Sequence, residues 1–414
     1  MQYRIFLYFV IFIKLFLFSL IAYYNAQNSK AVIVVPVVDA VNQSLIKENK
    51  VNPVSINKNV IDLYNSIEYA PERGRNACLR THQLLFNEVV IVRKEFKSEV
   101  QCELNSLFYY DEKDVLRQDF WIPKSALKYF KDINEIDIKA IPLPYRLENT
   151  VVYKKNILTL IFPWHDLLTK KTYSAGTRFI RNLDYDTNNY YSIFLLDSDL
   201  GKVISYVDKS LAIVEYPNDY ETSIYLFMDI LKRFLNKDNL IIPYLWGGCS
   251  YIDRLDESNF RLKTINQFGQ LVKAWTREID KRPLTGFECS SLILRVAQMV
   301  GMPYFCKNTA TLSKTLRPLI KGEYIEKGDL IWYEGHVLIV SDVDKNLLIE
   351  SVGYPLGYGK LHEINISKVF KDIQDYKELL NLYLTKGKLQ RIDKIGKIYR
   401  YIDNFLILKL KSIW

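Results

Sequence analysis

The stretch Gly286-Phe287-Glu288-Cys289-Ser290-Ser291 carries the clearest structural signal in this chain of 414 residues. It leads into apolar residues at positions 292, 293, 296, 297 and 300, and this spacing predicts the buried face of a helix. Cys289 would then lie at the helix N-terminus, where unpaired amides and the helix dipole stabilise a thiolate and lower the pKa of a cysteine. The same amides can donate to the oxyanion of a tetrahedral intermediate. An isolated cysteine before an apolar helix is more often a small core residue, so other residues must decide.

A tight turn downstream precedes a histidine that could act as the base. Lys327-Gly328-Asp329-Leu330-Ile331-Trp332-Tyr333 leads through Glu334-Gly335 into His336-Val337-Leu338-Ile339-Val340. This pattern predicts two strands, with His336 at the start of the second one. An unperturbed pKa of about 6.5 lets a histidine take and return a proton near neutrality, as a cysteine nucleophile requires. Considered alone, a histidine at this position would be a structural residue.

Two residues compete to orient the imidazole of His336. A further strand, Leu347-Leu348-Ile349-Glu350-Ser351, would bring Glu350 next to His336 if the two strands pair antiparallel. His362 is the competing third residue, and an ordinary edge carboxylate is the alternative interpretation of Glu350. The chain contains only four histidines, so any imidazole-dependent mechanism has few candidates.

Four short motifs follow one another in the second half of the chain: Pro243-Tyr244-Leu245-Trp246-Gly247-Gly248, the Cys289 stretch, Gly328-Asp329-Leu330-Ile331, and the His336 strand. Their residues and order resemble the NlpC-type, papain-like cysteine peptidases of bacterial cell walls. The resemblance covers about residues 230–352. It implies a catalytic domain in which the nucleophile helix packs on an antiparallel sheet. It also implies amide hydrolysis in peptidoglycan stem peptides by Cys289, with His336 as general base. Tyr244 would line the site and assist the oxyanion, or else be a rim aromatic.

Two small all-β modules are expected before this domain, because short β-like stretches separated by polar turns fill residues 84–207. The stretch from Gln83 to Leu127 resembles bacterial SH3-like domains, with Asn87 at a position where these domains have a hairpin glycine. The expected fold class is α+β, a papain-like catalytic domain preceded by two SH3-like barrels. The expected divisions are residues 27–75 (unassigned), 76–135 and 136–217 (SH3-like), and 218–414 (peptidase with a basic C-terminal extension).

The same arrangement resembles the branch of the family that cleaves γ-D-glutamyl-diamino acid bonds in peptides with a free N-terminal L-alanine. In that branch an acid before the nucleophile and a serine after it help to bind the ammonium group, and here these are Glu288 and Ser290. Trp246 is a further expected substrate-binding residue. Phe120 stands where a tyrosine normally completes the pocket, and Ser291 replaces the usual glycine. Residues 251–287 are an insertion that would be a lid, a rim or a solvated loop and helix.

An apolar N-terminus indicates export. Residues 5–24 are almost wholly apolar after Arg4, which is typical of a signal peptide or of a retained membrane anchor over residues 1–26. A buried core helix is the third alternative. Either of the first two would place the remainder in the periplasm, the cell envelope or the extracellular space, with possible membrane attachment through residues 5–24.

Composition narrows the possible partners. Lys+Arg 56 against Asp+Glu 47 gives a net charge of +9, and more than half of the surplus lies after residue 362. This distribution favours an anionic wall polymer or membrane surface over nucleic acid. The five cysteines, Cys78, Cys102, Cys249, Cys289 and Cys306, contain no C-x-x-C pair, so no zinc or other metal site, no cofactor and no complete disulfide framework is indicated. At least one thiol should be free.

Two functions other than peptide hydrolysis are alternatives for this chain. A papain-like domain without activity could serve a wall-binding or adhesion protein, and an acyltransferase could use the same nucleophile with a different acceptor. The presence of both Cys289 and His336 favours the hydrolase, because loss of activity usually removes one of these two groups. The preferred substrate is therefore peptidoglycan or a muropeptide, and the sequence does not indicate an oligomeric state.

Overall fold

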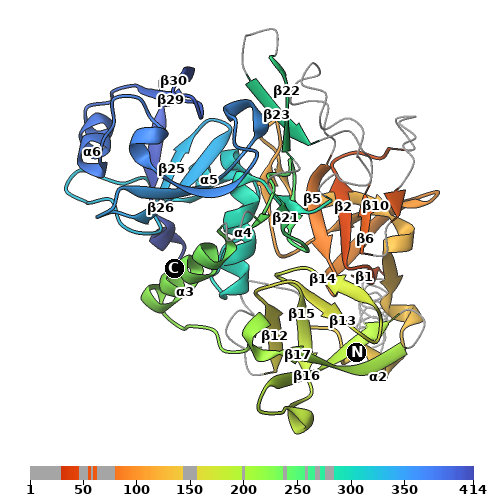
Figure 1. Ribbon diagram of the computed structural model, residues 1–414. Coiled ribbons are helices and arrows are strands. Elements are labelled where there is room, and N and C mark those ends of the chain that lie inside the picture. The colour runs from red at the N-terminus through yellow and green to blue at the C-terminus, as the bar shows by residue number, and fades with distance from the viewer. Residues whose placement is uncertain are drawn as a thin grey trace, which may run out of the picture.

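The computed structural model describes residues 29–45, 55–56, 59–62, 80–142, 156–197, 201–235, 240–256, 260–265, 271–275 and 284–414. Its secondary structure is mostly β-strand with few helices, which confirms the α+β class (Figure 1). The expected targeting segment, residues 1–26, lies outside the described residues. Within the described ranges, no helix is both long enough and apolar enough to cross a membrane.

The first sheet has nine strands, and four of them come from residues 27–75, for which the sequence suggests no structure. Its strand order is β11-β1-β6-β7-β10-β2-β4-β3, with β5 also paired to β2. The strands are β1 Lys30–Ile33, β2 Val37–Val41, β3 Ser55–Ile56, β4 Val60–Asp62, β5 Arg80–Leu85, β6 Val89–Phe96, β7 Glu99–Glu103, β10 Asp119–Pro123 and β11 Leu127–Tyr129. A small hairpin of β8 (Tyr109–Tyr110) and β9 (Leu116–Arg117), and the short helix α2 (Glu135–Ile138), lie beside it in the chain.

The second sheet has five antiparallel strands in the order β17-β16-β15-β12-β18. They are β12 Ile157–Leu160, β15 Arg178–Arg181, β16 Tyr190–Asp197, β17 Gly201–Asp208 and β18 Ala212–Ile213. The separate hairpin of β13 (Trp164–Asp166) and β14 (Lys171–Tyr173) supplies aromatic side chains to the same core. Strands β12, β15, β16 and β17 lie in the β-like part of the sequence, whereas β18 lies beyond it.

The third sheet carries the histidine motif, in the order β28-β27-β26-β25-β31. Its strands are β25 Leu330–Tyr333, β26 His336–Asp342, β27 Leu347–Val352, β28 Lys360–Asn365 and β31 Phe405–Leu408, all antiparallel. Strand β31 forms one edge of this sheet, because it pairs with β25. The associated helices are α3 Tyr220–Phe234, α4 Cys289–Met299, α5 Thr309–Thr315 and α6 Tyr376–Leu384.

Short strand pairs connect the larger elements. They are β19 Leu240–Ile241 with β21 Leu255–Asp256, β20 Cys249–Ser250 with β24 Gly286–Phe287, β22 Phe260–Ile265 with β23 Leu271–Trp275, and β29 Leu389–Ile392 with β30 Ile398–Ile402. The pair β22 and β23 lies inside the insertion at residues 251–287. That part of the insertion is thus a hairpin and not a loop and helix, and whether it forms a lid or a rim stays a prediction.

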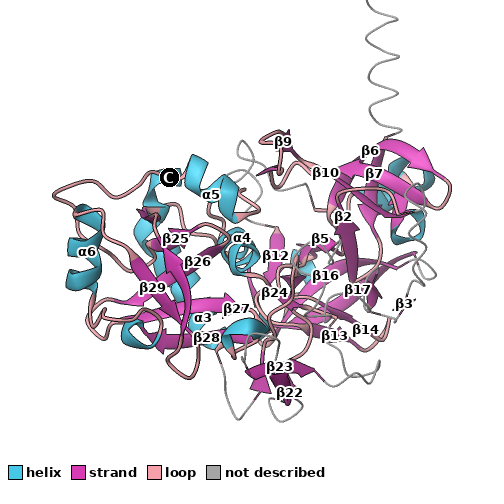
Figure 2. Cartoon of the chain, turned by 90° about the horizontal axis from the view of Figure 1, so that it is seen from above, coloured by secondary structure: helices cyan, strands magenta, loops and turns pink. Residues whose placement is uncertain are grey.

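Helix α4 lies between the first and third sheets. Figure 1 shows it with β25 and β26 on one side and with β5 and β2 on the other, and Figure 2 shows the same order from above. Every residue of α4 is buried. Its apolar side chains belong to one core that also includes Val90 and Phe120 of the first sheet and Val337 of β26. The helix that begins with Cys289 is therefore held by two sheets at once.

Candidate active site

Cys289 is the first residue of α4, as its position before the apolar spacing predicts. Strand β24 leads into the helix and pairs with β20, so that Cys249 faces Phe287. The backbone of Tyr244 lies on the other side of Phe287 in a parallel bridge. The Pro243–Gly248 motif thus supports the last residues before the nucleophile. Cys289 is 8% exposed, and the backbone amides of Val337 and Ser290 act to lower the pKa of its thiol.

The electrostatics of the thiol differ from the expectation. Burial, and after it the charge of Glu288, raise the pKa of Cys289 to about 12. The amides of Val337 and Ser290 and the charge of Lys307 oppose this shift without cancelling it. The helix N-terminus was expected to lower the pKa of Cys289. Burial instead destabilises the thiolate by more than the nearby amides stabilise it. This direction favours the protonated thiol at neutral pH, and a thiol in that form needs a neighbouring base before it can act as a nucleophile.

His336 is the candidate for a base at this site. It begins β26, next to Val337, whose backbone amide acts on the pKa of the Cys289 thiol. Its Nε2 lies 2.9 Å from Oε2 of Glu350, which leaves Nδ1 as the ring nitrogen for proton exchange. Burial lowers the pKa of His336, although the hydrogen bond and charge of Glu350 partly raise it again. The imidazole is therefore neutral at pH 7, which is the form that a general base needs.

Glu350 is a buried carboxylate shared by two histidines and one arginine. Oε1 lies 3.0 Å from Nε2 of His362 and 2.7 Å from Nη2 of Arg391, while Oε2 meets His336. Burial disfavours the charged form, but Arg391 and the two histidine hydrogen bonds hold the pKa of Glu350 well below its usual range. Of the two competing residues, Glu350 is the one bonded to His336, and His362 lies directly across from Glu350 on β28.

The sequence does not indicate that Arg391 belongs to the site. It lies on β29, in the basic C-terminal region, where apolar and charged residues alternate without a clear period. Its side chain is nevertheless 1% exposed and reaches Glu350 across 41 positions of the chain. A buried arginine cannot be told from a surface arginine by composition, because only tertiary packing decides which of them is covered.

The remaining motif residues lie around the helix start. The backbone N–H of Tyr244 donates to the carbonyl of Gly359 at 2.9 Å, and its ring lies beside Gly353. Trp246 is half-buried, and its carbonyl accepts a hydrogen bond of 3.2 Å from Nη1 of Arg80 in the first sheet. The motif is thus attached both to the third sheet and to the first.

Glu288, which precedes the nucleophile, is fully engaged within the protein. Its Oε2 accepts from the N–H of Gly247 at 2.9 Å, and its Oε1 accepts from the hydroxyls of Ser290 at 3.2 Å and Ser291 at 2.8 Å. The ammonium group of Lys307 pairs with the same Oε1 and donates to the Ser291 hydroxyl at 2.6 Å. Lys307 was not among the residues indicated by the sequence.

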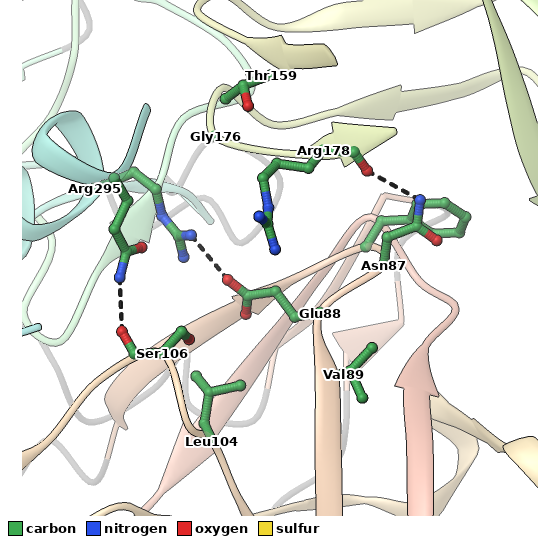
Figure 3. A pocket seen from close by; sticks show the side chains of 11 residues that line it. Asn87, Glu88, Val89, Leu104, Ser106, Thr159, Gly176, Arg178 and Arg295 are labelled. Carbon is green, nitrogen blue, oxygen red and sulfur yellow. Dashed lines mark hydrogen bonds and ion pairs between the residues drawn. The ribbon is translucent and has the colours of Figure 1, made fainter. Parts of the chain in front are cut away.

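Helix α4 and the two N-terminal sheets surround a small polar cavity of about 20 Å³. Arg295 pairs with Glu88 at 2.8 Å and donates to the carbonyls of Cys249 and Gln83, while Gln298 donates to Ser106. Figure 3 shows the guanidinium groups of Arg295 and Arg178, from α4 and from the second sheet, both directed toward Glu88. A space of this size holds about one water molecule. The cavity is therefore too small for a substrate, and the polar contacts around it join α4 to the two sheets.

Comparison with solved structures identifies the fold. An NlpC/P60 family protein from Bacillus cereus ATCC 10987 superposes with a TM-score of 0.52 at 15% identity, covering 82% of this chain and 94% of that one. An NlpC/P60 endopeptidase from Photobacterium damselae subsp. piscicida gives a TM-score of 0.45 at 12% identity, with 93% and 74% covered. No protein-family model matches the sequence, and no curated protein aligns with it. The chain therefore shares the fold of the Bacillus protein along most of its length.

Proposed function

We propose that this protein is a cysteine peptidase of the NlpC/P60 type that hydrolyses an amide bond in peptidoglycan stem peptides. The observation that carries the proposal is the grouping at one point of the fold of a helix N-terminal Cys289, the start of the His336 strand, and Glu350 bonded to His336. The fold likeness to an NlpC/P60 family protein supports it. The preferred bond is γ-D-glutamyl-diamino acid, as the resemblance of the motifs implies.

The mechanism follows from the protonation states. As Sγ of Cys289 attacks the carbonyl carbon, Nδ1 of neutral His336 takes the thiol proton, and Glu350 stabilises the imidazolium that forms. Amides at the start of α4, and the hydroxyl of Tyr244 in its predicted role, would stabilise the oxyanion. The imidazolium then gives its proton to the leaving amine. A water molecule, deprotonated by His336, next attacks the thioester carbonyl, which releases the acid and restores the thiol.

Substrate binding and location complete the proposal. Glu288, Ser290 and Trp246 stay predicted substrate-binding residues, since all three lie at or beside the helix start. The first two sheets would be SH3-like modules that contact the wall. The protein would act outside the cytosol if residues 1–26 are a signal peptide or an anchor.

Digestion of purified muropeptides tests the proposal. The full-length protein should cleave the γ-D-glutamyl-diamino acid bond and leave a product that ends in γ-D-Glu, detected by mass spectrometry, and Cys289→Ala should abolish this cleavage. Cys306→Ala is a matched control, because Cys306 is a buried free thiol that the mechanism does not use. Retained activity in Cys289→Ala would overturn the mechanism. Wall binding without cleavage would favour the inert binding protein, and transfer of the acyl group to an added amine would favour the acyltransferase.

A further inference from the structure

An internal ion pair occupies the carboxylate next to the nucleophile. Oε1 and Oε2 of Glu288 together accept from the Gly247 amide, the Ser290 and Ser291 hydroxyls and the Lys307 ammonium. Three of these donors share Oε1, which is thereby saturated, while Oε2 accepts from the Gly247 amide and keeps at most one acceptor position. Lys307 also balances the charge of Glu288, and the cluster is neutral as a whole.

Lys307 is held in this place by the backbone. Its N–H donates to the carbonyl of Phe108 at 3.0 Å, and the N–H of Phe108 donates to Phe305 at 2.8 Å. Residues 305–307 thus run beside Phe108, with which Cys306 forms a parallel bridge. The side chain of Lys307 is 4% exposed, and that of Glu288 is 14% exposed. The lysine is therefore a built part of the site and not a mobile surface group.

The pair lies within electrostatic range of the reacting thiol. Glu288 is the carboxylate whose charge raises the pKa of Cys289, and Lys307 lowers it. A second ammonium group placed beside Glu288 would be repelled by the Lys307 ammonium. The negative charge of Glu288 could not offset this repulsion, because Lys307 already neutralises it. Like charges repel strongly in a largely desolvated site. An uncharged acyl group would meet a neutral, hydrogen-bonded surface.

We infer that Lys307 makes this protein select stem peptides whose amino terminus is acylated, and reject those with a free α-ammonium group. The inference rests on the proposed peptidase function. It differs from the expectation that Glu288 and Ser290 bind a substrate ammonium, because Lys307 supplies that ammonium from within the chain. The preferred substrate would be a stem peptide still joined through an amide to the glycan strand, and not a released free peptide.

Two matched peptides test the inference with the full-length protein. They are L-Ala-γ-D-Glu-meso-diaminopimelate and its N-acetyl derivative. At pH 7 we expect kcat/KM to be at least about tenfold higher for the acetylated peptide. An α-amino group has a pKa of about 8, so the preference should narrow at pH 9, where the free peptide loses its charge. A structural role for Lys307 alone would not produce this dependence on pH.

Substitution of the lysine should change the preference. Lys307→Met frees the Glu288 carboxylate, and the ratio of the two kcat/KM values should fall to about one or reverse. Lys314→Met is the control, since Lys314 pairs with Asp114 on the surface and its ratio should equal that of the wild type. If Lys307→Met does not fold, the wild-type ratio and its pH dependence still decide. Equal cleavage of the two peptides by the wild type, or a preference for the free one, overturns the inference alone. Failure to cleave either peptide overturns the proposed function and the inference with it.

Discussion

At the scale of single residues, the candidate site depends on how charge is distributed around Glu350. One carboxylate serves two histidines and Arg391, and all four side chains are buried or nearly so. Arg391 keeps Glu350 ionised, and ionised Glu350 can accept from His336 and hold its ring. The same arginine also lowers the pKa of His336, which keeps the base unprotonated. Two opposing effects on one imidazole thus come from neighbouring groups.

Substitutions at the two competing third residues separate their roles. Glu350→Gln removes the group that stabilises the imidazolium, so kcat should fall by about 100-fold or more. His362→Gln removes only a partner of the other oxygen, and its loss of kcat should be smaller than about tenfold. Steady-state kinetics of both variants, after circular dichroism has established that each is folded, provides the comparison. A larger loss in His362→Gln would reverse the assignment.

The pH profile gives a second measurement on the same residues. Because burial lowers the pKa of His336, the acidic limb of kcat/KM in the wild type should lie below pH 6.5, where the imidazole becomes protonated. Glu350 raises that pKa, so Glu350→Gln should move the limb to still lower pH. Movement toward higher pH in this variant would contradict the arrangement described for the site.

At the scale of elements, the sequence predicts those whose signal is local. Helix α4 is visible because its apolar residues keep a helical period, and β26 and β27 are visible as short apolar runs joined by turns. Since these two strands are consecutive, their antiparallel pairing brings Glu350 to His336 as expected. Strand β2 is buried at all five positions and shows no alternation. Lys307 and Arg391 reach the site only through contacts distant in the chain, which no local pattern encodes.

The turn that contains Gly247, just before β20, is held in place by the first sheet. Gly247 has φ +67°, and a Cβ there would lie 2.4 Å from the carbonyl oxygen of Arg80. Arg80 is buried, pairs with Asp39 at 2.8 Å and donates to Trp246. The first sheet therefore sets the position of the turn whose amide donates to Glu288.

Gly247→Ala should separate the turn from the first sheet. We expect kcat/KM to fall at least about tenfold and the melting temperature to drop, because the added methyl must displace backbone. Gly201→Ala is a matched control, since Gly201 has φ +70° but no atom lies within 4 Å of the place that its added methyl group would take. Equal effects of the two substitutions would mean that backbone strain alone matters, and that contact with the first sheet does not.

At the scale of the whole molecule, the N-terminal sheets pack together with α4 and are not separate attachments. A single apolar core runs from the first sheet through α4 into the third sheet. Arg295 joins the nucleophile helix to Glu88, and Asn87 beside it donates to the carbonyl of Arg178 in the second sheet. Asn87 adopts φ +66°, a conformation that asparagine tolerates, which explains how it occupies the hairpin position of a glycine. The first and second sheets therefore meet beside Arg295 of α4 (Figure 3).

Glu88→Gln should weaken this junction from a position far from the chemistry. The substitution leaves the largely buried Arg295 without its carboxylate, so the free energy of unfolding should fall by about 2 kcal/mol. Urea denaturation should show a lower midpoint with an unchanged slope, because the three sheets unfold together. Glu103→Gln breaks the exposed pair with Arg93 on the same sheet and should change the midpoint little. Two separate transitions in the wild type would instead show that the sheets fold independently, and kcat should then be insensitive to Glu88→Gln. A single transition, with reduced stability and reduced kcat in Glu88→Gln alone, is the outcome expected if the orientation of Cys289 depends on the N-terminal sheets.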